Sequence, residues 1–91
     1  MSASNEQSIE SVMSELSDID RLLTEDTSGE RAKAMVAYFE QAATASEERV
    51  ASLPIDDAKR VLAKHLVEGF RASARVIRHV WETLHTVSLP A

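Results

Sequence analysis

The residues of this chain best suited to metal chemistry lie near its C-terminal end. His79, Glu82 and His85 are three residues apart, and Glu82 with His85 has the Glu-x-x-His form of carboxylate-bridged metal sites in helix bundles. Such a site needs a second Glu-x-x-His and further inward carboxylates, and this chain has one copy. A helical wheel also places the group mainly on a polar side. We therefore predict no metal site, and we attribute His85 to the favourable position of a cation near a helix C-terminus.

Three arginines form a second group that could bind a ligand. Arg71, Arg75 and Arg78 follow one side of the same expected helix, as a ridge that could hold a carboxylate or a phosphate bidentately. Small all-helical enzymes that bind dianions keep such arginines inside a bundle, whereas this ridge points outward. One interpretation is a solvated face with pairs such as Lys64 and Glu68. The other is a docking ridge for an acidic partner.

Nucleophilic catalysis has no support in the sequence. No serine stands in a visible arrangement with a histidine and an acid, and the absence of cysteine excludes disulfides and thiolate metal sites. We predict no catalytic residue, no cofactor and no enzymatic activity. The alternative kept open is a small all-helical enzyme acting on an anionic metabolite.

Length and charge limit the remaining classes. The 91 residues suffice for one domain, and the formal charge of −5 argues against nucleic-acid binding through a basic face. Residues 1–30 carry eight acids and one arginine, whereas residues 31–91 carry nine bases and seven acids. We expect the acidic segment to be solvated or to lie across the basic face of the C-terminal helix. No secretory or membrane-spanning segment is visible, which predicts a soluble cytoplasmic protein without membrane contact.

The spacing of apolar residues predicts an all-α fold of three helices in a single domain, residues 1–91. Residues 1–26 are expected to form an acidic N-terminal helix, over about 5–23, and a linker. A second helix over 27–53 is introduced by the capping pattern of Thr27 and Glu30. Pro54 should end it, and a third helix over 54–87 should return alongside it. The second and third helices are thus predicted to form an antiparallel hairpin.

The third helix carries more apolar surface than one antiparallel neighbour can cover. Its apolar arc spans about half the circumference, whereas a surface helix needs a stripe of about 100°. Its far end should extend beyond the second helix unless the first helix folds back over it. We therefore predict a partner-binding site at this end, with apolar anchors and orienting charges at Phe70, Ile77, Trp81, Leu84, Arg71, Arg75 and Arg78. Trp81 fits a core position equally well.

Two bacterial families resemble this pattern. Asp57-Ala58-Lys59, with Ser73-Ala74, Ile77 and His79 downstream, is similar to the second half of the small helical-hairpin co-chaperones of the type III secretion needle. That resemblance, over about residues 32–84, implies a hairpin that binds a superhelical chaperone and helps to hold the needle subunit unpolymerised. The acidic first helix departs from that family.

The second resemblance is to the quorum-sensing antiactivators, which are small helical dimers that remove a transcription factor from DNA. It rests on Leu53-Pro54 between two helices and on Leu89-Pro90 after the last. From both, we expect a binding protein that masks an amphipathic helix of another protein through a helix–helix interface. Such a secretion-type chaperone or co-chaperone would be a homodimer or part of a hetero-oligomer. An antiactivator that inhibits a transcription factor is the alternative.

Overall fold

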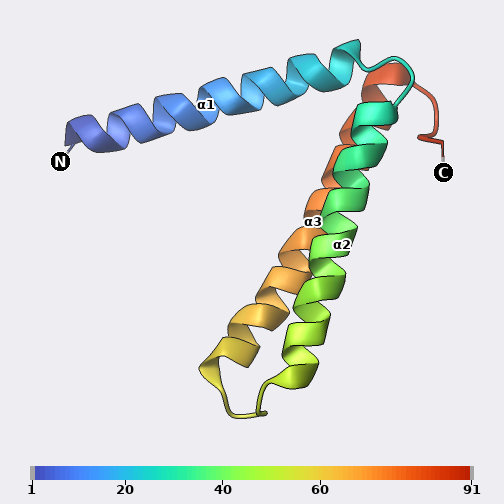
Figure 1. Ribbon diagram of the computed structural model, residues 1–91. Coiled ribbons are helices and arrows are strands. Elements are labelled where there is room, and N and C mark those ends of the chain that lie inside the picture. The colour runs from blue at the N-terminus through green and yellow to red at the C-terminus, as the bar shows by residue number, and fades with distance from the viewer. Residues whose placement is uncertain (1, 91) are drawn as a thin grey trace.

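Three helices form this molecule, and two of them make an antiparallel hairpin. The computed structural model describes the backbone of residues 2–90 and the side chains of residues 9–90. Helix α1 spans Ser2–Glu25, α2 spans Glu30–Ser52 and α3 spans Ala58–His85. Helices α2 and α3 pack side by side along their length, and α1 leaves the open end of the hairpin as a separate arm (Figure 1). The predicted all-α hairpin with an additional N-terminal helix is confirmed.

The two hairpin helices meet along rows spaced alternately by four and three residues. This spacing keeps one side of each helix facing its neighbour, as in coiled coils. Alanines at the contact leave little side-chain volume between the two backbones. The α3 row is Ala63, Val67, Phe70, Ala74, Ile77 and Trp81, and the α2 row is Ala32, Val36, Phe39, Ala43, Ser46 and Val50, all of them buried or half-buried.

The largest buried side chains lie at the open end of the hairpin. Trp81 is 1% exposed and packs in one cluster with Leu23 of α1 and Leu89 of the C-terminal segment. The Trp81 indole Nε1 donates to the backbone oxygen of Asp26 at 2.7 Å, and the Leu89 amide donates to a Glu82 carboxylate oxygen at 2.8 Å. The ends of α1 and α3 and the C-terminal segment are therefore joined around one indole ring.

Both connections differ from the predicted helix boundaries. The expected cap at Thr27 is not used, since α2 begins at Glu30 after Gly29, which has a left-handed φ of 79°. Asp26 instead accepts the Ala32 amide at 2.8 Å with its side chain, and so satisfies an N-terminal amide of α2 from outside the helix. Helix α3 begins four residues later than predicted, because Asp57 is its N-cap.

The arm does not fold back over the hairpin. Apart from the last turn, where Leu23 is buried, the apolar side chains that the structure describes in α1, from residue 9 on, are exposed: Ile9 is 62% and Leu16 57% exposed. Of the two positions expected for the acidic segment, the described residues of the arm therefore show the solvated one and not the one across the basic face of the third helix. The arm and the hairpin span 45 × 44 × 15 Å, a flat and angular shape (Figure 1).

Candidate partner-binding face

Helix α3 carries a second row of small and apolar residues, one position before the row that contacts α2. Its members repeat the spacing of four and three almost throughout, but they are exposed or half-exposed: Leu62, Leu66, Gly69, Ser73, Val76, Val80 and Leu84. Successive residues of an α-helix are turned by about 100°, so this row lies to one side of the α2 contact. Helix α2 does not cover it.

Helix α2 has a matching row, again one position before its contact row: Arg31, Met35, Tyr38, Ala42, Ala45 and Arg49. In each helix, the step back from the contact row to the preceding residue is a rotation of about 100° in the same sense about the helix's own axis. Because the two helices run antiparallel, this rotation places both rows on the same side of the hairpin. Together the two rows form one long surface, which we call the apolar face. Apolar and small side chains make up its middle, and the exposed arginines Arg31 and Arg49 stand toward its two ends.

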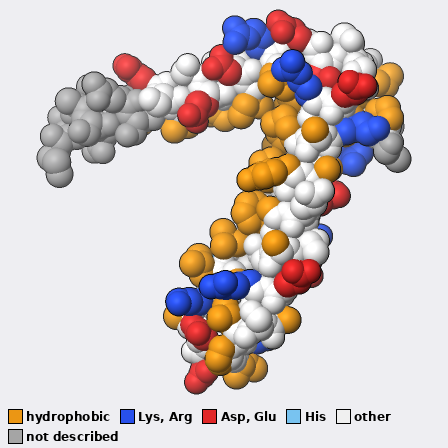
Figure 2. Space-filling model, in the orientation of Figure 1, with side chains coloured by type: hydrophobic (Ala, Val, Ile, Leu, Met, Phe, Trp, Pro, Cys, Tyr) orange, Lys and Arg blue, Asp and Glu red, His pale blue; other side chains and the backbone are white. Residues whose placement is uncertain are grey.

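The apolar face lies on the side of the hairpin from which the arm projects. Hydrophobic side chains gather on the sides of the arm and of the hairpin that face each other (Figure 2). Neither row of the apolar face contains an acidic residue. Near its middle, a Cβ atom built on Gly69 would meet no atom within 4 Å, so a neighbouring helix could approach the α3 backbone closely there.

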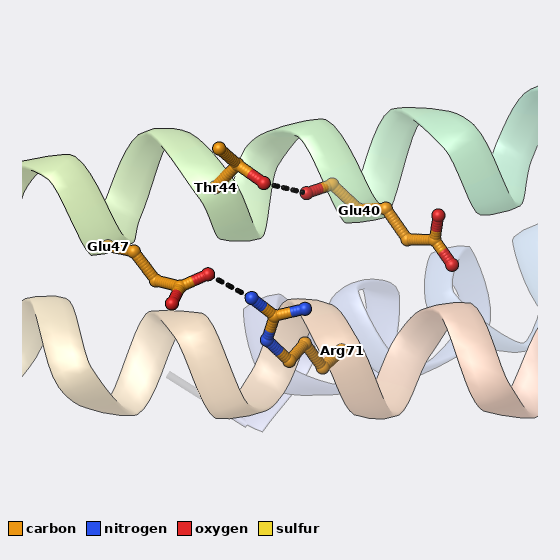
Figure 3. A network of polar contacts seen from close by, with 4 residues as sticks. All are labelled: Glu40, Thr44, Glu47 and Arg71. Carbon is orange, nitrogen blue, oxygen red and sulfur yellow. Dashed lines mark hydrogen bonds and ion pairs between the residues drawn. The ribbon is translucent and has the colours of Figure 1, made fainter.

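The opposite side of the hairpin is charged. It carries the residues one position after each contact row, among them Glu40, Thr44 and Glu47 of α2 and Lys64, Glu68, Arg71, Arg75, Arg78 and Glu82 of α3. We call this surface the charged face. Arg71 is paired with Glu47 across the two helices, with the arm behind the hairpin in this view (Figure 3). Both partners are about half-exposed, so the pair contributes little to stability.

The structure separates the predicted partner-binding residues into three locations, which are the interior of the hairpin, the end of the apolar face and the charged face. Phe70 is half-buried and stacks on Phe39 with ring centroids 6.4 Å apart. Ile77 and Trp81 belong to the buried core, whereas Leu84 is 42% exposed at the end of the apolar row.

The third location is the charged face, where the three predicted arginines lie. Arg71, Arg75 and Arg78 border a shallow depression together with Glu40. Arg71 and Arg75 are exposed, as expected for an outward ridge, and Arg78 is half-buried. The acidic neighbours Glu40 and Glu47 offset part of the positive charge of this ridge.

His85 and Glu82 have structural partners. The His85 ring stacks on the Trp81 ring with the two ring centroids 4.5 Å apart, and the His85 Nε2 is 2.7 Å from the Leu23 backbone oxygen. His79 is exposed. Among the residues whose side chains are described, no group of three or more histidines and carboxylates could hold a metal ion. None of the described helices is long and apolar enough to cross a membrane.

The apolar face as a whole is not among the site residues predicted from the sequence. Most of its α3 residues belong to the predicted broad apolar arc, but that arc contains two rows, and only one of them contacts α2. One signal in the sequence could have revealed the face. In each of the two helices, a second row of apolar and small residues with nearly the same spacing lies one position before the row that contacts the other helix.

A comparison with models of protein families gives a match. The model of a family described as "Type III secretion system regulatory protein HrpD6" matches residues 5–83. The matched stretch includes nearly the whole arm, the hairpin loop and most of α3. A comparison with curated proteins found no match, and neither did a comparison with solved structures.

Proposed function

Because this chain belongs to the HrpD6 family of type III secretion system regulatory proteins, we propose that it acts by binding another protein of that system. In this proposal the hairpin masks an amphipathic helix of the partner, without catalysis and in the cytoplasm. The match to a secretion family agrees with the resemblance to secretion co-chaperones.

The observation that carries the proposal is the apolar face. Monomeric proteins rarely leave a long contiguous apolar surface exposed, and such surfaces commonly mark interaction sites. The apolar positions of the face recur at steps of three and four residues, which is the spacing that an amphipathic helix presents to its binding surface. The partner helix would bury Leu62, Leu66 and Val76 against its own apolar stripe.

The charges of the two faces favour a partner with acidic residues. Arg31 and Arg49 would meet carboxylates that flank the apolar stripe of the partner helix, and such contacts set orientation and association rate. The ridge of Arg71, Arg75 and Arg78 would add long-range attraction from the opposite side. Phe70, Ile77 and Trp81 would support the face from beneath, and Leu84 would contact the partner at its end.

The test uses one substitution on each face. Leu66→Glu places a negative charge in the middle of the apolar face. Arg75→Glu reverses a charge on the charged face, which is a larger change in net charge than that of Leu66→Glu. Each full-length variant is co-expressed with individual proteins of the same secretion system, and the complexes are purified. We expect Leu66→Glu to abolish a complex that Arg75→Glu retains. Loss of the complex in Arg75→Glu alone would place the partner on the charged face and overturn the proposal.

The word "regulatory" in the family description favours a second candidate. The same face could hold a helix of a transcriptional regulator, as the antiactivator alternative implies. A reporter for secretion genes separates the two candidates. An antiactivator predicts that Leu66→Glu raises gene expression as strongly as deletion of the gene does. A chaperone predicts loss of a secreted protein while expression of its gene is unchanged.

A further inference from the structure

The arm has the chemistry that the apolar face would bind. Its apolar residues follow the same spacing of three and four, and all but the last are exposed: Ile9, Val12, Leu16, Ile19 and Leu23. Carboxylates flank this row on both sides, Glu15 and Asp18 on one and Glu10 and Asp20 on the other. The arm is thus an amphipathic helix with acidic flanks, whereas the apolar face has only arginines among its charged residues.

The arm is held away from its own hairpin. We call the junction of the arm, the 26–29 turn and the end of α3 the elbow. There the Asp26 backbone oxygen accepts the Trp81 indole, its carboxylate accepts the Ala32 amide, and the Leu23 oxygen lies against His85. Swinging the arm down onto the hairpin would have to break these contacts and withdraw the buried Leu23 from the core.

The exposed area matches what a dimer would cover. The chain exposes 6767 Å², whereas a compact monomer of 10.0 kDa is expected to expose about 5,200 Å². Its radius of gyration is 16.4 Å, against about 12 Å for a compact domain of this length. The excess surface of about 1,500 Å² per chain would give a dimer interface of the size found in permanent homodimers.

We propose that the missing cover is a second copy of this chain. The arm of each copy lies on the apolar face of the other, with its apolar row against Leu62, Leu66 and Val76. Its carboxylates approach Arg31 and Arg49, and the small residues around Gly69 admit the arm closely. The inference concerns the same face as the proposed function, and it implies that a partner helix must displace an arm.

The first experiment measures the mass of the full-length chain by light scattering during size-exclusion chromatography. We expect about 20 kDa, twice the mass of 10.0 kDa for one chain. We expect Leu16→Glu in the arm and Leu66→Glu on the apolar face each to raise the dissociation constant at least about tenfold. Lys64→Glu, at an exposed position of the charged face outside the arginine ridge, should leave the dimer intact. Thermal melting by circular dichroism checks that each variant is folded, and Val76→Glu replaces Leu66→Glu if that variant is not. A wild-type chain that remains monomeric at micromolar concentration overturns the proposal.

The second experiment mixes the two monomeric variants. The Leu66→Glu chain has an intact arm and the Leu16→Glu chain has an intact face, so one arm-to-face contact survives in the mixed pair. We expect mixing to restore dimers that neither variant forms alone. If only Leu16→Glu breaks the dimer, the arms pair with each other. If only Leu66→Glu does, the faces pair. Either result overturns the arm exchange.

These outcomes are distinguishable from those of the proposed function. A monomer that still binds a secretion protein through Leu66 would remove the dimer and keep the function. A dimer with arm exchange that binds no secretion protein would keep the dimer and remove the proposed function.

Discussion

At the scale of single residues, the two glycines of the chain are expected to respond in opposite ways to the same substitution. Gly29 has a positive φ, and a Cβ there would lie 2.7 Å from a Leu89 methyl and 3.1 Å from the Trp81 ring. Gly69 lies in the exposed interior of α3 with open space around it. The first position combines backbone strain with overlap at the elbow, and the second has neither.

We therefore expect Gly29→Ala to lower the free energy of unfolding by about 1–3 kcal/mol. Gly69→Ala should raise it by up to about 1 kcal/mol, since alanine is the better helix former. Urea denaturation followed by circular dichroism checks both, in the Leu16→Glu background so that dimer formation does not contribute. Equal effects at the two positions would contradict the described turn.

Asp26 provides a second test at this scale, because its side chain caps α2 from outside the helix. Asp26→Asn keeps an oxygen that can accept the Ala32 amide, whereas Asp26→Ala removes it. Loss of such a cap typically costs about 1 kcal/mol. We expect urea denaturation to show Asp26→Ala as the less stable variant by about that amount. If the two variants are equally stable, the carboxylate does not cap the helix.

At the scale of elements, the helices were predictable from apolar spacing and from Pro54, but their ends were not. The start of α2 depends on Asp26, which lies six residues before the amide that it accepts, outside the usual capping pattern. The start of α3 depends on Asp57, which accepts the Lys59 amide at 2.8 Å.

The separation of the predicted site residues also has a physical reason. A helical wheel shows that Leu66 and Trp81 share one broad arc, but it does not show which part of that arc the neighbouring helix covers. The covered part of the arc is determined by the antiparallel pairing of the helices and by Trp81, whose indole donates a hydrogen bond to the backbone oxygen of Asp26. The direction of the arm was unpredictable for the same reason, since its row fits either its own hairpin or another copy.

Hydrogen exchange tests the independence of the arm. Residues 9–19 make few contacts outside their own helix in the single chain, so their amides should exchange at rates set by local helix opening. Amides near Ala32 and Ile77 should exchange far more slowly. In the wild-type chain, protection of residues 9–19 should rise with protein concentration, and in Leu16→Glu it should not. Concentration-independent protection of the arm would mean that it docks within one chain.

At the scale of the whole molecule, the angular shape is itself a prediction. Small-angle scattering of the monomeric Leu16→Glu variant should give a radius of gyration close to 16.4 Å. A three-helix bundle with the arm folded back would measure about 12 Å. The hydrodynamic radius from chromatography should agree, because a shape with an extended arm migrates as a larger particle than a compact one of equal mass.

The elbow also makes the chain its own optical probe. Its single tryptophan sits where the arm, the turn and the C-terminal segment converge, and the ring is shielded from solvent. Fluorescence from that indole should stay at short wavelength when another helix covers the apolar face, and it should shift to the red if the arm swings. The emission wavelength of Trp81 should therefore distinguish a binding event that moves the arm at the elbow from one that only covers the apolar face.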